Sequence, residues 1–334
     1  MIRLGLMGCG TVADYGHIPT IQATDGLELV ALFDPNPARL EAMQTKFEVP
    51  AGFTDPEAFL AGGLDAVTIT SPAPYHLENV LAAVRCGLPV LCEKPLAMNE
   101  AEAETMIAAA EAAGVPLYVG FDYRFSPVSQ TIGRLMAERA MGEPRALRLI
   151  YIWHLHGQRT ADGRLNQRRV DRMREGGPMV DCGVHQIDLA RFWTGSEFVR
   201  QNAFGVWQEE FEAPGHVWLH LDHANGVHTM VEISFSYGAT AAQPRPQFVY
   251  EVIGTDGVLR YDREAKSFEL RNSHGTTPLQ FASEKSFSGM YAELARALAS
   301  GAPGAMPTGS DGLIATRVAR RATDEVIAAR RNHS

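Results

Sequence analysis

The chain opens with the run IRLGLMGCGTVA at residues 2–13, and this run decides the fold. Its first half is mostly apolar and predicts a buried strand, while the glycines that follow lead directly into a helix. Gly8 permits a tight turn, Gly10 lets the backbone approach a pyrophosphate, and Ala13 still allows close packing of helix on strand. The phosphates would bind at the amide groups and the positive dipole end of that helix. The run therefore predicts a dinucleotide-binding unit.

A carboxylate at the end of the next predicted strand strengthens this interpretation. The strand covers residues 27–33 and is followed by Asp34, about 20 residues beyond the glycine turn, where a ribose-binding acid is expected. A carboxylate that accepts a hydrogen bond from the ribose 2'-hydroxyl would repel a 2'-phosphate, which favours NAD over NADP. Arg39 follows closely and could bind that phosphate, so NADP stays possible.

Length and composition set the limits for the rest of the chain. The 334 residues predict two domains, and 46% hydrophobic with 21% charged residues supply material for two cores. The net charge of −9 argues against nucleic-acid and membrane partners, because both surfaces are anionic. A small polar ligand is the expected partner.

The four cysteines and the N-terminus predict a cytoplasmic protein. Cys9 and Cys92 lie inside the predicted ligand-binding loops, where a disulfide would disturb the loops, so we expect reduced thiols. No basic leader, apolar signal region or membrane-spanning run precedes or interrupts the first strand. We therefore expect neither secretion nor a membrane anchor.

The first 120 or so residues alternate short apolar runs with alanine-rich amphipathic segments. Strands are predicted at 65–70, at 89–92 and at 116–120, with helices at 77–86 and 99–113 between them, which indicates a parallel sheet with crossover helices. Ligands of such sheets bind beyond the carboxyl ends of the strands. Thr70 and Ser71, Glu93 and Lys94, and the segment 121–125 all stand at such ends, so we expect them around one crevice.

The second part of the chain changes to the pattern of an antiparallel sheet. A connecting helix near residues 127–140 is followed by alternating runs at 217–222, 227–235 and 248–253, and by the turn Gly254–Gly257. Two further helices are predicted near 289–299 and 311–330. The predicted fold is a Rossmann domain with a parallel sheet, residues 1–122, and an α+β domain with a large, mostly antiparallel sheet for substrate binding and oligomerisation, residues 123–334. The histidines at 216, 220, 223 and 228 are interpreted as residues of the sheet surface.

A second group of chemically active residues lies between those two patterns. Asp181, His185 and Asp188 recur at intervals of four and three, which places them near one face of a predicted helix. His185 could be a catalytic base or a core histidine paired with a carboxylate. A divalent metal chelated by the three residues is the weaker alternative, because no further His/Cys cluster points to this helix. We predict no metal.

The glycine turn, the Glu93-Lys94-Pro95 triplet, the Asp181–Asp188 helix and the Gly254–Gly257 turn together resemble the Gfo/Idh/MocA family of oxidoreductases. The resemblance covers essentially the whole chain and implies the two-domain fold just described. It also implies that Lys94 lies near the nicotinamide and the substrate oxygen, that His185 accepts the proton, and that Asp181 holds a substrate hydroxyl. Since desolvation could lower the pKa of Lys94, either Lys94 or His185 could be the principal acid/base group.

Other candidates carry two interpretations each. His76 either packs at a helix N-terminus or contacts the cofactor. Arg124 either borders the substrate or anchors a domain interface, and the Lys94–Pro95 bond is either cis or trans. The arginine-rich segment from Arg159 to Arg174 is either a solvated or oligomer-facing loop or a substrate lid, in which case the substrate could carry a carboxylate or phosphate. His154 and His156, two residues apart on a predicted strand, could border the same pocket.

The predicted site residues fall into three overlapping groups. The catalytic group is Lys94, His185 and Asp181, and the substrate-binding group is Lys94, Arg124, His154, Asp181 and His185. The cofactor-binding group is Gly8, Gly10, Thr11, Val12, Asp34, Arg39, Thr70, Ser71, His76, Glu93 and Lys94.

The sequence thus predicts an NAD(P)-dependent dehydrogenase or reductase acting on a sugar, an inositol-like polyol or a related hydroxy compound. A nucleotide-binding sugar sensor without turnover is one alternative, although it would not require both Lys94 and His185. An enzyme that uses NAD transiently in glycoside cleavage or elimination is another. We expect a homo-oligomer, dimer or tetramer, associated through the open face of the second sheet.

Overall fold

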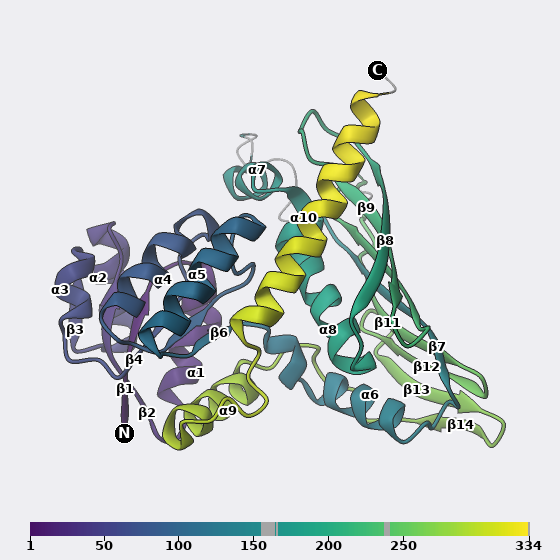
Figure 1. Ribbon diagram of the computed structural model, residues 1–334, viewed down its shortest axis with the longest axis horizontal. Helices are drawn as coiled ribbons and strands as arrows, with labels where there is room; N and C mark the ends of the chain where they lie inside the picture. The colour runs from purple at the N-terminus through teal and green to yellow at the C-terminus, as the bar shows by residue number, and fades with distance from the viewer. Residues whose placement is uncertain (155–163, 165, 237–240, 333–334) are drawn as a thin grey trace. The chain divides into compact units, whose positions relative to one another are not determined.

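The structure is a computed structural model that describes residues 1–154, 164, 166–236 and 241–332. The chain forms two compact units, which Figure 1 shows in colours that follow the sequence. The first consists of Met1–Phe125 and Lys285–Thr316, and the second of Ser126–Glu284 and Arg317–Ser334. The sequence-based division at residue 122 differs from this one, because it assigned all of residues 285–316 to the second domain.

The first unit is built on a parallel sheet, as predicted. Its strand order is β3-β2-β1-β4-β5-β6, and every neighbouring pair runs parallel. The order reverses between β1 and β4, which is the point where ligands of such sheets bind. The short β3 escaped the sequence analysis because its three residues lack an apolar run. The strands are β1 (Ile2–Met7), β2 (Leu27–Phe33), β3 (Ala51–Phe53), β4 (Ala66–Ile69), β5 (Val90–Cys92) and β6 (Leu117–Val119).

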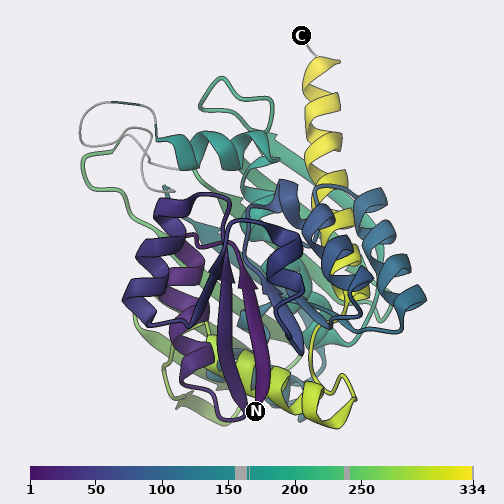
Figure 2. The same cartoon turned by 90° about the vertical axis from the view of Figure 1, so that its left-hand side faces the viewer.

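Helices lie on both faces of this sheet (Figure 2). Local capping explains where two of them begin: the side chain of Asn36 accepts hydrogen bonds from the first amides of α2, and that of Asn99 does the same for α5. Since both faces are covered, the strands read as continuous apolar runs. The helical segments are η1 (Ala13–His17), α1 (Ile18–Gln22), α2 (Pro37–Phe47), α3 (Pro56–Leu60), η2 (Ala73–Tyr75), α4 (His76–Arg85), α5 (Glu100–Ala113) and η3 (Asp122–Phe125).

Helix α9 (Phe287–Ser300) also belongs to the first unit, although it comes from near the C-terminus. Met290, Tyr291 and Leu294 are buried in one core with Leu4 and Leu6 of β1. The sequence shows the amphipathic period of this helix but not its partner. The predicted domain division therefore failed to place it with the nucleotide-binding sheet.

The second unit is built on a mostly antiparallel sheet, as predicted. The order is β14-β13-β12-β11-β7-β10-β9-β8, and only the central pair β7 and β10 is parallel among the described strands. The turn Gly254–Gly257 joins β11 to β12. The strands are β7 (Pro144–Ile152), β8 (Phe198–Val206), β9 (His216–His223), β10 (His228–Ser234), β11 (Gln247–Gly254), β12 (Gly257–Asp262), β13 (Ser267–Asn272) and β14 (Gly275–Pro278).

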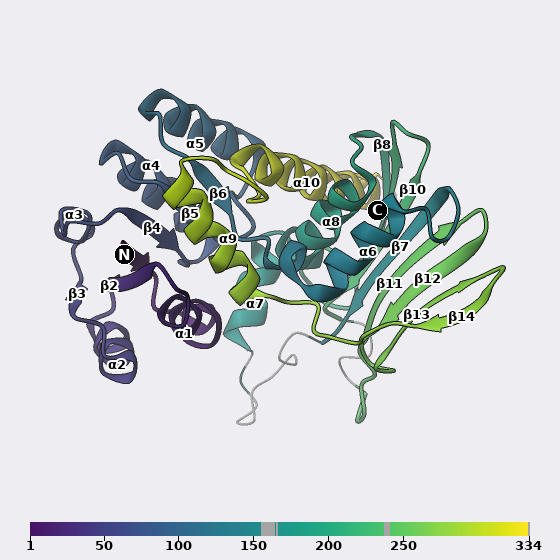
Figure 3. The ribbon, with the colours of Figure 1, turned by 90° about the horizontal axis from the view of Figure 1, so that it is seen from below.

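One face of this sheet is covered by helices, and the described residues place no helix on the other (Figure 3). Helix α8 (Val184–Thr194) packs on β10 and against α6 (Pro127–Ala137), where Trp193 donates from Nε1 to Ser129 Oγ at 3.0 Å. The strands accordingly alternate: Leu219 and Leu221 of β9 are buried, and Trp218, His220 and Asp222 are half-buried. Of the histidines interpreted as surface residues, His216 and His223 are buried instead. His216 lies against the ring of Trp218 and beside Glu232, and His223 lies beside Thr194 and Ser196 at the end of α8.

The remaining helices are α7 (Gln167–Arg174), η4 (Met179–Gly183) and α10 (Gly309–Arg331). The boundary between the two units falls within α10, after Thr316. Among the helices that the structure describes, none combines the length and the apolar composition needed to cross a bilayer.

Candidate active site

The carboxyl ends of the parallel strands bring most predicted cofactor residues to one edge of the first sheet. Gly8 follows β1, Asp34 follows β2, Thr70 follows β4 and Glu93 follows β5. The strand ends are also linked directly, since Thr70 Oγ1 donates to the carbonyl of Gly8 at 2.6 Å. These residues stand at the predicted strand ends, because parallel strands of one sheet end on the same side.

Gly8 and Gly10 have different steric reasons to be glycine. Gly8 adopts φ +106, and a Cβ there would lie 2.6 Å from the backbone nitrogen of Ser71. No described atom lies within 4 Å of the position of a Cβ at Gly10. A side chain at Gly10 would fill the open space in front of the following helix. This is the space where a pyrophosphate must approach the amides, so the turn fits a dinucleotide.

Asp34 is held rigidly against the glycine turn. Its Oδ2 accepts a hydrogen bond from the Cys9 amide at 2.9 Å, and its Oδ1 accepts one from the Asn36 amide at 2.9 Å. Each oxygen keeps a lone pair for a further donor such as a ribose hydroxyl. Burial, followed by the charge of Asp34, raises the pKa of the Cys9 thiol to about 12, and Arg39 acts in the opposite direction. Arg39 itself is exposed in the first turn of α2.

The structure describes all four cysteines, which the sequence predicts to be reduced thiols. Cys9, Cys86, Cys92 and Cys182 are all free thiols. Burial also raises the pKa of Cys92 well above its usual value. Neither Cys9 nor Cys92 is therefore a reactive thiolate at neutral pH.

His76 joins two loops of the strand-end edge. One ring nitrogen, Nε2, lies 2.8 Å from the carbonyl oxygen of Ser71, and Nδ1 lies 2.9 Å from that of Pro95. The side chain is 1% exposed. Burial lowers the pKa of His76, and a neutral ring donates a hydrogen bond to only one of these two carbonyls. These backbone contacts favour the structural interpretation of His76, and its contact with a cofactor stays a prediction.

Lys94 is half-buried at the end of β5 and is joined to Pro95 by a cis peptide bond. The carboxylate of the preceding Glu93 is 7% exposed, and its Oε2 accepts a hydrogen bond from the Lys94 amide at 3.1 Å. Its Oε1 lies 2.8 Å from Nε2 of His17, and Nδ1 of His17 lies 2.6 Å from the hydroxyl of Tyr291. Neither His17 nor Tyr291 is among the residues predicted from the sequence. A histidine next to the apolar Ile18, in the helix after the glycine turn, was the available signal for His17.

Arg124 lies in η3 and is 7% exposed. Its guanidinium is 3.1 Å from Asp311 Oδ1, and both residues belong to the first unit. The ion pair ties η3 to the first turn of α10. It gives Arg124 an anchoring role within one unit, and substrate contact by Arg124 stays a prediction.

In the second unit, the predicted Asp181, His185 and Asp188 do not share one regular helix. Asp181 lies in the π-helical segment η4, whereas His185 and Asp188 lie in the α-helix α8 that continues it. A π turn contains an extra residue and interrupts the helical period, so the spacing of four does not place Asp181 directly beneath His185. His185 is 5% exposed and Asp188 is 3% exposed, while Asp181 is half-buried. Short π segments occur frequently at functional sites, and a second one among the described residues, η1, follows the glycine turn.

Charged groups from neighbouring elements surround Asp181. Cys182 Sγ lies 3.6 Å from its Oδ2. Burial by itself lowers the pKa of the Arg172 guanidinium. The carboxylates of Asp181 and Glu175 have the larger opposite effect, so this pKa is raised above its usual value. Burial raises the pKa of Tyr151 well above its usual value, and the charges of Cys182 and Asp181 add to this effect. The sequence analysis did not single out Tyr151, although it stands near the carboxyl end of β7.

The arginine-rich segment contains residues of different kinds. Arg169 is 1% exposed, because its guanidinium pairs with Glu209 and donates to the carbonyl of Phe235 at 2.7 Å and to Ser236 Oγ at 2.8 Å. For this residue the prediction of a solvated side chain is wrong, whereas the oligomer-facing loop and the substrate lid stay predictions for the segment. Arg164 and Arg168 are exposed, and Arg159 lies outside the described residues.

The two predicted strand histidines are also placed differently. Strand β7 ends at Ile152, so His154 follows the strand and is half-buried. His156 lies outside the described residues. Across the described ranges, no three His, Cys, Asp or Glu side chains are grouped so that they could hold a metal ion.

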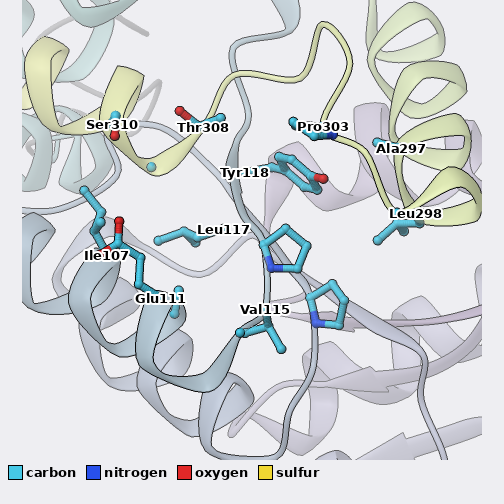
Figure 4. Close-up of a pocket in the computed structure, with 16 residues that line it drawn as sticks. Ile107, Glu111, Val115, Leu117, Tyr118, Ala297, Leu298, Pro303, Thr308 and Ser310 are labelled. Atoms are coloured by element: carbon cyan, nitrogen blue, oxygen red, sulfur yellow. The ribbon is translucent and has the colours of Figure 1, made fainter.

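A pocket of about 500 Å³ lies elsewhere in the first unit (Figure 4). It is lined by the end of α5, by Pro116 and Leu117 at the amino end of β6, and by the connection from α9 to α10, including Pro303 and Thr308. The predicted cofactor residues stand at the carboxyl ends of the strands instead. This pocket is therefore separate from the candidate site.

Comparisons with known proteins bear on both units. Residues 2–121 match the family described as "Oxidoreductase family, NAD-binding Rossmann fold", and residues 129–260 match the "GFO/IDH/MocA C-terminal domain". D-apiose dehydrogenase of Paraburkholderia graminis is 32% identical over 272 residues, which cover 81% of this chain and 70% of that protein. D-glucoside 3-dehydrogenase of Escherichia coli K12 is 28% identical over 287 residues, covering 75% of this chain and 78% of that protein.

A solved structure shares the fold. The crystal structure of an oxidoreductase from Agrobacterium radiobacter in complex with NAD+, L-tartaric acid and magnesium has a TM-score of 0.83 and 24% sequence identity. The match covers 98% of this chain and 96% of that one. The similarity therefore extends over both units of the fold.

Proposed function

Since this chain belongs to the Gfo/Idh/MocA family of oxidoreductases, we propose that it transfers a hydride between a nicotinamide cofactor and a secondary alcohol, or the matching carbonyl, of a sugar, polyol or related hydroxy compound. The observation that carries the proposal is the position of Lys94. It stands at the end of β5, on the same edge of the sheet as the glycine turn and Asp34. A lysine at that edge can act on a substrate held beside a bound dinucleotide.

The residues of the strand-end edge would hold the cofactor, which supplies or accepts the hydride. Gly8 and Gly10, with the amides of Thr11 and Val12, would bind the pyrophosphate, and Asp34 would bind the adenosine ribose. Because the Asp34 carboxylate is held in place by two amides, a 2'-phosphate would meet a fixed negative charge. NAD is therefore the favoured cofactor. Exposed Arg39 is the residue that could still accommodate NADP.

Lys94 and His185 have complementary roles in this proposal. As an alcohol is oxidised its oxygen loses a proton, and an imidazole with an unperturbed pKa of about 6.5 is suited to accept it near neutral pH. His185 would take that proton. The ammonium group of Lys94 would stabilise negative charge that develops on the same oxygen. Asp181 would accept a hydrogen bond from a substrate hydroxyl, and Arg124 and His154 are proposed at the border of the substrate.

A panel of sugars, polyols and inositols tests the proposal directly. Purified protein is incubated with each compound and with NAD or NADP, and both NADH or NADPH formation and the product are measured. Net NADH formation with at least one compound is expected. Product release without net reduction would instead support transient use of NAD, and nucleotide binding without any product would support a sensor. Tighter binding of NADP than of NAD would overturn the cofactor preference.

The open face of the second sheet is the proposed oligomer interface. On this face Phe204 and Val206 of β8 are 57% and 44% exposed, and half-buried Trp218 and Met230 lie on the strands beside them. Large apolar side chains grouped on a surface are typical of a protein–protein contact. A second copy of the chain would cover them. Light scattering should therefore give a dimer or tetramer, and Phe204→Glu should lower the mass toward that of the monomer.

A further inference from the structure

Glu93, the residue before Lys94, belongs to a buried group of polar side chains in the first unit. His17 is its centre: Nε2 is 2.8 Å from Glu93 Oε1, and Nδ1 is 2.6 Å from the Tyr291 hydroxyl. The Tyr291 hydroxyl is also 3.4 Å from Oγ1 of Thr68, on β4. Three elements that are far apart in sequence, η1, β5 and α9, thus meet through one imidazole ring.

The group is shielded from water. His17, Tyr291 and Thr68 are each 0% exposed, and Glu93 is 7% exposed. The ring of Phe287, also from α9, packs edge-on against His17 with 4.9 Å between centroids. A buried network of this kind is costly unless every polar atom is paired, so its pairing constrains where each member can lie.

The protons of the group can be arranged in two ways that leave no ring nitrogen unpaired. In a neutral His17, Nε2–H donates to Glu93 and Nδ1 accepts from the Tyr291 hydroxyl. In a protonated His17 both nitrogens donate, and the Tyr291 hydroxyl donates to Thr68. Burial raises the pKa of Tyr291, so the hydroxyl keeps its proton in either case.

The Glu93 carboxylate is stabilised in its ionised form. Burial opposes its charge, but the hydrogen bond from His17 and the charges of His17 and Lys94 outweigh burial and lower its pKa. The titratable groups around it are His17, Lys94, Tyr291, Cys92 and His76.

The same carboxylate contacts the backbone that carries Lys94. Its Oε2 accepts a hydrogen bond from the Lys94 amide at 3.1 Å, while Oε1 faces His17. Gly120, after β6, packs against the Glu93 carboxylate: a Cβ at Gly120 would lie 2.9 Å from Oε1. One oxygen of Glu93 is therefore bound to the buried group and the other to the lysine's own peptide.

We propose that His17 and Tyr291 are positioning residues: they hold the Glu93 carboxylate in one orientation, and Glu93 in turn fixes the backbone and the charge of Lys94. This inference rests on the proposed function of Lys94 in hydride transfer, and it assigns a role to three side chains that do not touch the substrate. A carboxylate that lost its buried partner would reorient or take up a proton, which would weaken the hydrogen bond to the Lys94 amide and the attraction between the two charges.

The first test reads Lys94 directly and needs no turnover. The chain has four lysines, Lys46, Lys94, Lys266 and Lys285, so NMR of isotopically labelled lysine gives few signals, and Lys94→Arg assigns the one of interest. In Glu93→Gln the midpoint of the Lys94 titration should fall by about one pH unit, because a neighbouring negative charge is removed. In Tyr291→Phe and His17→Ala the Lys94 signal should shift or broaden. His17→Gln, which keeps a donor for Glu93, should restore part of the change.

Matched variants separate positioning from general damage to the core. Tyr118→Phe removes a hydroxyl from another buried tyrosine of the same core, and it should leave the Lys94 signal unchanged. Gly120→Ala alters no titratable group but presses on Glu93, and it should move the Lys94 signal. The free energy of unfolding of each variant identifies those that are merely unstable.

The second test follows the reaction once a substrate is known. Tyr291→Phe should lower kcat about three- to tenfold with little change in KM for the cofactor, and Glu93→Gln should move the alkaline limb of the pH profile to lower pH. An unchanged Lys94 titration in Glu93→Gln, together with unchanged Lys94 signals in Tyr291→Phe and Gly120→Ala, would overturn the positioning role. If no substrate is ever turned over while the NMR changes occur as expected, the proposed function fails and the positioning of Lys94 stands.

Discussion

The two sheets of this protein present their functional side chains in opposite ways. In the parallel sheet, strands such as β4 are buried on both faces, and the candidate residues stand beyond the strand ends. In the second sheet, β9 and β10 alternate, one face is covered by helices, and the candidate residues lie on η4 and α8 rather than on a strand. The first sheet thus builds a site from its edge, and the second serves as a platform for a helix.

Because of this difference, the sequence predicts the site residues of the first unit more directly than those of the second. A strand end is a position that the sequence marks by the last apolar residue of a run, so the apolar pattern alone was enough to place Asp34 and Lys94. A helix on a platform can rotate or change its period without altering the apolar pattern beneath it. The π turn at Met179–Gly183 is such a change.

The largest expected effect tests whether the strand end and the helix contribute to the same reaction. Lys94→Ala and His185→Ala should each lower kcat by about 10²- to 10⁴-fold, because charge stabilisation and proton transfer are lost, while the affinity for cofactor stays largely intact. Steady-state kinetics and cofactor titration measure both. Exposed Lys46→Ala and His274→Ala are the controls and should be close to the parent protein. Full turnover in both site variants would refute the assignment.

The next effect concerns stability and compares the faces of the two sheets. Leu29 is buried in the core that contains α9, while Phe33 packs against Phe59 on the other face of β2; they are 6% and 8% exposed, so Leu29→Ala and Phe33→Ala should each cost about 2–5 kcal/mol of unfolding free energy. In β9, Leu219→Ala should cost a similar amount. His220→Ala, on the neighbouring position of the open face, should cost less than about 1 kcal/mol.

Denaturant unfolding of the four variants gives these values. Equal losses for Leu219→Ala and His220→Ala would mean that the second sheet is covered on both faces in solution. That result would support the oligomer proposal, because the proposed partner copy would cover the open face of the second sheet.

A moderate effect is expected at the ribose position of the first sheet. Asp34→Ala should weaken NAD binding by roughly ten- to hundredfold, since a hydrogen bond to a charged acceptor is lost, and should narrow the difference between NAD and NADP. Isothermal titration with both cofactors measures this. Asp34 also accepts a hydrogen bond from the Cys9 amide, so Asp34→Ala removes a contact of the glycine turn as well. Asp14→Ala removes a carboxylate from η1, outside that turn, and is the control. Stronger discrimination against NADP in Asp34→Ala would contradict the ribose assignment.

The smallest effect is the response of the two units to acid. His223, in β9, is 3% exposed, and burial lowers its pKa. The unfolded chain therefore binds a proton first, so stability is full above about pH 6.5 and declines as the pH falls toward the lowered folded pKa. The pKa of Glu93 is also lowered, as its hydrogen bond with His17 outweighs burial, so its contribution is present above about pH 4.3 and is lost below that.

The two windows can be separated with two variants. His223→Gln should flatten the loss of stability that begins as the pH falls below about 6.5, and Glu93→Gln should flatten the loss below about pH 4.3, in urea unfolding followed as a function of pH. If His223→Gln leaves the loss of stability below about pH 6.5 unchanged, burial does not control the protonation of the His223 ring.

Some features of the site depended on contacts that no local pattern contains. Arg169 was grouped with solvated arginines because its neighbours in sequence are charged, yet it is buried through Glu209, Phe235 and Ser236, which come from distant segments. The domain division failed at α9 for a similar reason. An amphipathic period shows that a helix has a buried face, but it does not identify the core that buries it.

The sequence by itself determined the glycine turn, the acid after β2 and the lysine after β5, because backbone sterics and the direction of parallel strands leave few places where those residues can stand. It also determined that the second sheet has one covered face, through the alternation of its strands. Only the tertiary structure decided that Tyr291, 274 residues beyond His17, completes the group behind Lys94. The closure of the chain onto the first sheet brings those side chains together, and hydrogen bonds of a buried network form only after that packing exists.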